Sequence, residues 1–216
     1  MADRPVFVPI SHGPRLVEEV PVQFTWNPGM APSQKKKNVI ALHEAAAKKG
    51  LSPLLEISSK SDRELGQRLS AFRLKLRVTG GETTLESAFQ GSKVFERGGP
   101  FSDLYWVESK EAKRDPRLKI SGRLVGFHFE DLEYPLTPST AFYDWLYINA
   151  LFPHRDWLRR LHQCAGFTDI EFNPKRSLNC QARSCATFVA LEKRNQLDDA
   201  IGSFWDFRTL LQTGFI

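Results

Sequence analysis

The chain has 216 residues, of which 41% are hydrophobic and 12% aromatic, so it is long enough to bury a core within one domain. Its net charge of +5 fits an anionic partner such as a nucleic acid or a nucleotide, whereas three cysteines without a Cys-x-x-Cys pair argue against a disulfide framework and a zinc site. No apolar run approaches the ~18 residues of a membrane span and the start has no secretory signal, so we expect a cytoplasmic protein without a membrane segment.

The first elements predicted along the chain are an extended segment, one helix and two strands. Residues 1–37 hold six of the thirteen prolines, and we expect this segment to be extended and loop-like rather than packed. Residues 38–50 follow a helical rhythm that ends at Gly50. Residues 53–58 and 72–78 are typical of strands, the second with alternating apolar and basic positions.

The remaining chain is predicted to be rich in helices. Residues 85–95 and 103–113 are expected to be helical, whereas residues 123–136 fit either a strand or irregular backbone. Residues 139–152 carry aromatics on nearly every side, which indicates a central, buried helix. Residues 156–166 and 185–211 supply further helices. The sum is a helix-rich α+β domain over residues 38–216, with a small β-sheet near its start.

One face of the helix predicted at residues 85–95 is unusually polar. Glu86, Gln90 and Lys93 fall at positions i, i+4 and i+7, so they share a face that adjoins the apolar stripe. This row could line a functional pocket. Alternatively, the pattern Thr83-x-x-Glu86 is that of a capping box, in which Glu86 only stabilises the start of the helix.

Two segments carry a resemblance to a known family. TTLESAFQGSKVF, with the preceding LLEISSKSDRELGQRLSAFRLKL, resembles the opening of the NADAR (YbiA-like) family, whose motif Glu-x-x-(Phe/Tyr)-Gln-x-x-Lys is met by Glu86, Phe89, Gln90 and Lys93. SLNCQARSCATFVALEKR resembles the closing stretch of that family, with Asn179 at its Asn. The resemblance covers residues 54–194 and implies a YbiA-like α+β fold.

The departures from this pattern point to one branch of the family. FTDIEFNPKRS replaces a Trp-Gly-x-Gly loop, so the acidic partner expected there falls to Asp169 or Glu171. The long N-terminal segment, FQGSKVFERGGP and FYDWLYINAL are similar to the branch encoded beside DarT-type toxins, which ADP-ribosylate DNA bases. This resemblance implies an antitoxin, paired with a DarT-type toxin, that removes ADP-ribose from guanine in ADP-ribosylated DNA.

Such an N-glycosidase would use its side chains in distinct roles. A carboxylate of Glu86 or Asp169 would stabilise positive charge at the ribose C1''. Lys93 would either attack C1'' or hold phosphate, and Gln90 would fix a ribose hydroxyl or one of the carboxylates. The substrate-binding residues expected beside them, in a cleft also lined by aromatics of residues 142–147, are Phe89, Gln90, Asp144, Trp145 and Asn179.

Two other functions remain open at this point. One is a YbiA-like N-glycosidase acting on a small phosphoribosylamino-pyrimidine, and the other is a non-catalytic antitoxin that binds ADP-ribose or the toxin. The basic clusters Lys35-Lys36-Lys37, Arg159-Arg160 and Lys175-Arg176 would contact DNA phosphates or form solvated surface. His128 and His154 lack metal-ligand spacing, and neither a metal nor another cofactor is predicted.

Overall fold

The N-terminal segment forms a hairpin, and the prediction of loop-like backbone is wrong for most of it. In a computed structural model that describes residues 1–212, β1 (Ala2–Pro9) pairs antiparallel with β2 (Val17–Phe24). Pro5 lies opposite Pro21, so the two missing N–H donors fall at one position of the hairpin. Val6 and Val22 are fully buried, because the β-branched residues of both strands pack against the next helix.

The hairpin belongs to a four-stranded sheet with the order β2-β1-β9-β3. β9 (Gly166–Thr168) pairs antiparallel with β1 and parallel with β3 (Leu54–Glu56), a strand in which every residue is buried. The helix α1 (Pro32–Ala47) packs its buried residues Val39, Leu42 and Ala46 against this sheet. α1 starts earlier than predicted because Pro32 suits a first turn, so the boundary expected between residues 37 and 38 falls inside it.

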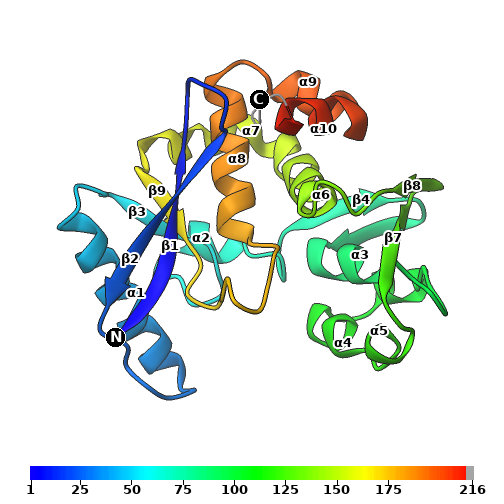
Figure 1. Ribbon diagram of the computed structural model, residues 1–216, viewed down its shortest axis with the longest axis horizontal. Coiled ribbons are helices and arrows are strands. Elements are labelled where there is room, and N and C mark those ends of the chain that lie inside the picture. The colour runs from blue at the N-terminus through cyan, green and yellow to red at the C-terminus, as the bar shows by residue number, and fades with distance from the viewer. Residues whose placement is uncertain (213–216) are drawn as a thin grey trace.

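Two helices form the centre of the molecule. α6 (Ala141–Leu151) is almost entirely buried, as predicted, and packs against α8 (Gln181–Lys193). Figure 1 shows these two helices between the hairpin side of the molecule and a second side, which is formed by α3 (Leu85–Gly91), α4 (Ser109–Arg114), α5 (Arg117–Ile120), β7 (Leu124–Phe129) and β8 (Leu132–Tyr134). α9 (Leu197–Gly202) and α10 (Phe204–Gln212) close one end of this layer.

Smaller elements build the other side. β4 (Lys75–Val78) and β5 (Gly81–Thr84) form a hairpin, and a three-stranded sheet has the order β6-β7-β8, with β6 (Lys93–Phe95), β7 (Leu124–Phe129) and β8 (Leu132–Tyr134). The short helices are α2 (Glu64–Arg68), η1 (Ser102–Trp106), α4 (Ser109–Arg114), α5 (Arg117–Ile120), η2 (Phe152–His154), α7 (Arg155–Leu158) and η3 (Arg159–Gln163). The chain is a single helix-rich α+β domain, as predicted.

The helix predicted at residues 85–95 is shorter than expected. α3 (Leu85–Gly91) ends at Gly91, where a Cβ atom would come within 2.5 Å of the Tyr105 ring. Lys93 instead begins β6 and pairs with Phe127 of β7. Separately, no helix in the described part of the chain combines the length and the apolar character that a bilayer crossing requires.

Candidate active site

A pocket of about 400 Å³ brings most of the predicted site residues together. It lies between α3, the segment before β4, and the loop that joins β9 to α8. Of the aromatics at residues 142–147 that were expected to line it, Tyr143 of α6 does so, whereas Phe142, Trp145 and Tyr147 are not among the lining residues. The lining residues are Ala71, Phe72, Glu86, Phe89, Gln90, Lys93, Lys113, Leu118, Tyr143, Asp169, Glu171, Phe172, Ser177, Asn179 and Gln181.

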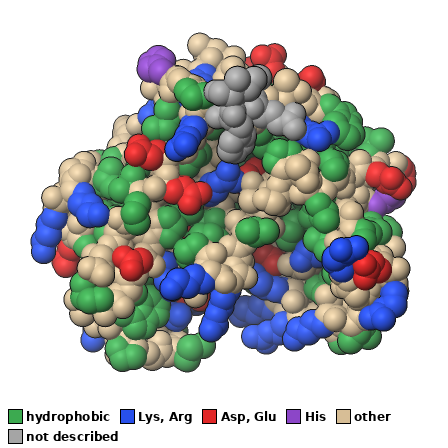
Figure 2. All heavy atoms as spheres, viewed as in Figure 1, with side chains coloured by type: hydrophobic (Ala, Val, Ile, Leu, Met, Phe, Trp, Pro, Cys, Tyr) green, Lys and Arg blue, Asp and Glu red, His purple; other side chains and the backbone are tan. Residues whose placement is uncertain are grey.

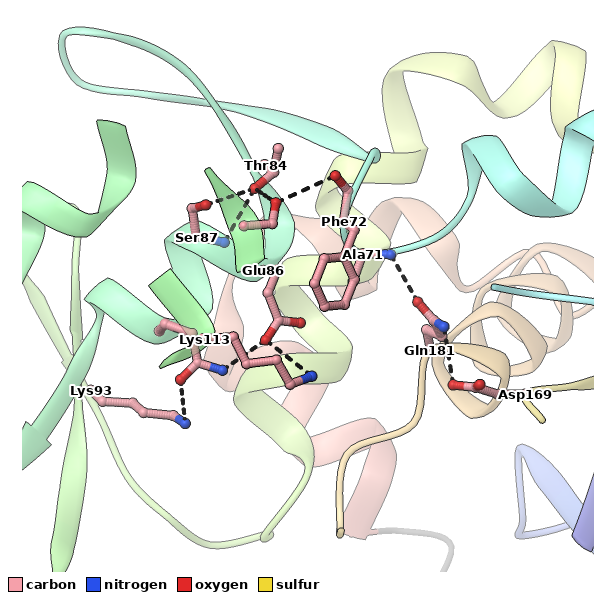
Figure 3. A network of polar contacts seen from close by, with 11 residues as sticks. Ala71, Phe72, Thr84, Glu86, Ser87, Lys93, Lys113, Asp169 and Gln181 are labelled. Carbon is pink, nitrogen blue, oxygen red and sulfur yellow. Dashed lines mark hydrogen bonds and ion pairs between the residues drawn. The ribbon is translucent and has the colours of Figure 1, made fainter. Parts of the chain in front are cut away.

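The start of α3 shows that Glu86 is not a capping residue. The N-cap is Thr84, whose hydroxyl accepts the backbone N–H of Ser87 at 3.2 Å. The capping box predicted from Thr83 is therefore wrong, because the helix begins one residue later. Glu86 is 4% exposed, and its carboxylate lies among the polar side chains of the pocket instead (Figure 3).

A row of hydrogen bonds fixes the polar face of α3. The Nε2 atom of Gln90 donates to Glu86 Oε1 at 2.8 Å, and Lys93 Nζ donates to Gln90 Oε1 at 2.7 Å. Lys113 Nζ of α4 lies 3.4 Å from the same Glu86 oxygen. Gln90 thus fixes a carboxylate, one of the two roles predicted for it, and holds Glu86 and Lys93 near one another without a direct ion pair (Figure 3).

Lys93 has an unusual environment for a lysine. Burial lowers its pKa to about 8; the charge of Glu86 opposes this shift and that of Lys113 adds to it. The ammonium lies 4.7 Å from the centroid of the Phe89 ring. A larger fraction of Lys93 is therefore neutral near pH 8 than for an exposed lysine, which suits a nucleophilic amine.

Asp169 forms the opposite wall of the pocket. It directly follows β9, is 8% exposed, and accepts hydrogen bonds at 3.0 Å from the N–H of Glu171 and from Gln181 Nε2. Gln181 Oε1 in turn accepts the N–H of Ala71 at 2.8 Å, so this wall is tied to the segment before β4 (Figure 3). Burial raises the pKa of Asp169.

The structure separates Asp169 from the alternative, Glu171. Glu171 also lines the pocket, but its side chain is 43% exposed and pairs with Lys35 of α1 at 3.2 Å. The charge of an exposed carboxylate that is paired with a lysine is screened by that lysine and by solvent, so it acts only weakly on a bound substrate. The buried Asp169 is therefore the stronger candidate for chemistry, and Glu171 belongs to the mouth of the pocket.

Asn179 supplies an unused acceptor. It lies just before α8 and lines the pocket, and its Oδ1 atom is buried without a hydrogen-bond partner among the described residues. An unsatisfied buried carbonyl costs about 1–3 kcal/mol, which a donor on a bound ligand would recover. This observation fits the substrate-binding role expected of Asn179.

Two predicted residues lie outside the pocket. Asp144 is 1% exposed and accepts hydrogen bonds from Ser184 Oγ at 2.5 Å and Arg183 Nη1 at 2.7 Å. Trp145 packs against Tyr134 and Phe204. Each residue turns a helix by ~100°, so α6 presents Tyr143 to the pocket while Asp144 faces α8.

We expect Asp144→Ala to lower the free energy of unfolding by about 3 kcal/mol, because it leaves Arg183 without its buried partner. The activity of each folded molecule should be unchanged, since Asp144 does not reach the pocket. Urea denaturation and an activity assay on the same sample check both parts. Loss of activity at unchanged stability would place Asp144 in the site after all.

Several lining residues were not predicted as site residues. They are Ala71, Phe72, Lys113, Leu118, Phe172, Ser177 and Gln181. Phe72 was assigned to a strand, and Lys113 lies on a short helix whose sequence carries no signal of a site. The start SLNCQ before α8 was recognised for Asn179 alone, although Gln181 two residues later holds Asp169.

Comparison with known proteins adds one finding. A family model described as "DarT1-associated NADAR antitoxin" matches residues 2–215. A search among curated proteins finds no match. The match spans almost the whole chain, including the N-terminal hairpin and every residue that lines the pocket.

Proposed function

The chain belongs to the family of DarT1-associated NADAR antitoxins, and from this premise we propose that it removes ADP-ribose from guanine bases in DNA. The reaction is hydrolysis of the N-glycosidic bond between the ribose C1'' and the base. The observation that carries the proposal is a pocket with a carboxylate on each of two walls and a half-buried lysine of lowered pKa that donates a hydrogen bond to Gln90.

The two carboxylates suit different parts of this reaction. Glu86 accepts a hydrogen bond from Gln90 and pairs with Lys113, so its carboxylate is held where it would stabilise the positive charge that develops at C1''. Asp169 has its pKa raised by burial, so it can donate a proton to the base nitrogen as the bond to C1'' breaks. Such a division of roles between two carboxyl groups is familiar from glycoside hydrolysis.

Lys93 completes the reaction as nucleophile. Its neutral amine forms a bond to C1'' while the bond from C1'' to the base breaks. Loss of the amine proton and opening of the ribose ring give an imine between Nζ and C1''. Water then adds to the imine, and cleavage of the C–N bond releases ADP-ribose and restores Lys93.

The surface around the pocket favours DNA over a small metabolite. Lys113 lines the pocket; Leu118, another lining residue, precedes Lys119; and Ser177 follows Lys175 and Arg176. Figure 2 shows Lys and Arg side chains gathered along the lower edge of the molecule, on both sides of a hollow. Positive groups from separate elements around one opening suit the phosphates that flank a modified base.

We expect the double variant Lys175→Ala, Arg176→Ala to bind modified DNA more weakly and with a salt slope smaller by about 2. Turnover of ADP-ribosylated guanosine, which has no flanking phosphates, should be unchanged. The matched control is Arg159→Ala, Arg160→Ala, because Arg159 pairs with Asp156 and Glu192 while Arg160 lies over the Trp157 ring. Equal salt slopes in both variants and wild type would argue for a small-metabolite substrate.

The direct test is to incubate the protein with a DNA oligonucleotide ADP-ribosylated at one guanine and to measure free ADP-ribose. We expect release to depend on protein concentration and to continue over many turnovers. Binding of the modified DNA without any release would favour the non-catalytic antitoxin instead. The same DNA carrying ADP-ribose on thymine serves as the control for the base.

A further inference from the structure

Another buried carboxylate, that of Glu56, forms hydrogen bonds with Thr168 and Ile170, the two neighbours of Asp169 in the chain. Glu56 of β3 is 1% exposed and lies opposite Thr168 in the parallel pair of β3 and β9. Its Oε1 atom accepts the N–H of Ile170 at 2.9 Å, and its Oε2 atom lies 2.7 Å from Thr168 Oγ1. The position of Asp169 in the chain is therefore held from both sides by one side chain.

The contact with Thr168 continues to a histidine on another element. His43 Nε2 of α1 lies 2.8 Å from Thr168 Oγ1. A hydroxyl donates one hydrogen and accepts another, so this chain has two proton arrangements. In one, a neutral Glu56 donates to Thr168 and Thr168 donates to His43; in the other, both bonds run the opposite way toward an ionised Glu56.

The surroundings of Glu56 favour its neutral form. Its hydrogen bonds with Ser58, Thr168 and Ile170 lower its pKa, but within the described residues no ion pair to a cation accompanies them, and the effect of burial is larger. A fully buried carboxylate without a cation is costly to ionise. Burial raises the pKa of Glu56, and the nearby charge of Asp169 raises it further. Burial also lowers the pKa of His43, so the histidine accepts a hydrogen bond readily.

We propose that Glu56 is a positioning residue: as a neutral acid it bonds both neighbours of Asp169 and lets Asp169 alone change charge at this wall of the pocket. This proposal about Glu56 rests on the proposed function in one respect only, the action of Asp169 on the substrate. The position and the protonation of Asp169 can be measured without any turnover.

Other ionisable groups around the pair bear on the test. They come from each neighbouring element and are Arg4 of β1, His43 of α1, Asp62 before α2, Tyr143 and Tyr147 of α6, Glu171 after β9 and Cys180 before α8. Arg4 is the cation among them that acts on Asp169. All of these groups are unchanged in the variants below, so a change in titration can be assigned to Glu56.

The experiment is a ¹³C NMR titration of the side-chain carboxyl groups in wild type, Glu56→Gln and Glu56→Ala. Gln keeps the shape of a neutral Glu56 and can donate to Thr168. In wild type we expect the chemical shift of the Asp169 carboxyl carbon to change in two steps as the pH rises. The first step is the ionisation of Asp169, and the second, smaller step at higher pH is the ionisation of Glu56. In Glu56→Gln the first step should keep its midpoint and the second should vanish.

Two outcomes would overturn the proposal. A midpoint of Asp169 lower by about one pH unit in Glu56→Gln would show that Glu56 is charged in wild type. A Glu56 carboxyl group that ionises at the same pH as Asp169 or at a lower pH in wild type would show that Glu56 is not the neutral acid of the pair. The matched control is Glu192→Gln: Glu192 lies outside the active-site pocket, with its Oε2 atom 2.6 Å from His162 Nε2, and its change should leave the Asp169 titration unchanged.

Turnover gives an independent readout. Glu56→Gln should keep kcat for ADP-ribose release within about threefold of wild type, whereas Glu56→Ala should lose tenfold or more in kcat with little change in KM. Thr168→Ser should retain activity and Thr168→Val should not, because only Ser keeps the hydroxyl. If wild type releases no ADP-ribose, the proposed function fails while the NMR result still decides the role of Glu56.

Discussion

Glu86→Gln is expected to lower turnover of ADP-ribosylated guanine DNA by a factor on the order of 100 or more. The change removes a negative charge from the pocket at nearly constant shape, and Gln can still meet the amide of Gln90. The free energy of unfolding should change by less than about 1 kcal/mol, because Thr84 and not Glu86 caps α3. Release of ADP-ribose and the melting temperature are measured on the same preparation.

Two control variants separate chemistry from helix stability. Thr84→Ala removes the cap and should cost about 1 kcal/mol of stability while leaving the turnover of folded molecules near that of wild type. Glu82→Gln removes an exposed carboxylate that pairs with Lys75 at 3.1 Å, outside the active-site pocket, and should change neither quantity. Full activity in Glu86→Gln would return Glu86 to a structural role.

Lys93→Ala is expected to reduce turnover at least as much as the change at Glu86, by roughly 100-fold or more, because it removes the amine proposed to attack C1''. Borohydride should trap a covalent adduct on the wild-type protein during turnover and none on this variant. Lys93→Arg is the informative second change, since it keeps a positive charge but supplies no nucleophile. Substantial activity in Lys93→Arg would assign Lys93 to phosphate binding.

The pH dependence of the same reaction tests both proposed roles. The proposed nucleophile is the neutral amine of Lys93, whose pKa burial lowers to about 8, and the proposed acid is the protonated form of Asp169, whose pKa burial raises. Single-turnover rates should therefore follow a bell-shaped curve, falling at low pH as Lys93 becomes charged and at high pH as Asp169 loses its proton. A lysine that holds phosphate as an ammonium would instead give an affinity that falls as the pH rises through about 8, without the loss of rate at low pH.

The sequence predicted those residues of the pocket that are spaced regularly within one short segment. Glu86, Gln90 and Lys93 were placed on one face by helical periodicity, and the structure brings them together although Lys93 has left the helix. The chain turns at Gly91 into β6, and the pairing of Lys93 with Phe127 keeps its side chain beside Gln90. A local pattern could not reveal β6, because this strand is defined by its pairing with β7, a segment distant in the sequence.

Contacts between distant segments were beyond the reach of local patterns. The N-terminal hairpin is held in the sheet by the pairing of Phe7 with Phe167, which prolines and loop-like composition did not predict. Asp144 and Trp145 adjoin Tyr143 in the sequence, yet only Tyr143 faces the pocket. The choice between Asp169 and Glu171 likewise required the structure, because burial and the ion pair with Lys35 distinguish them.

The most direct test of a hydrolytic active site is to run the reaction in water enriched in ¹⁸O and to measure the masses of the oligonucleotide and of the released ADP-ribose by mass spectrometry. The proposed chemistry predicts that the oligonucleotide returns to the mass of unmodified guanine DNA and that the released ADP-ribose carries one ¹⁸O at C1''. An oligonucleotide that keeps its full ADP-ribose mass in the presence of folded, DNA-binding protein would contradict the assignment of this pocket to glycosidic cleavage.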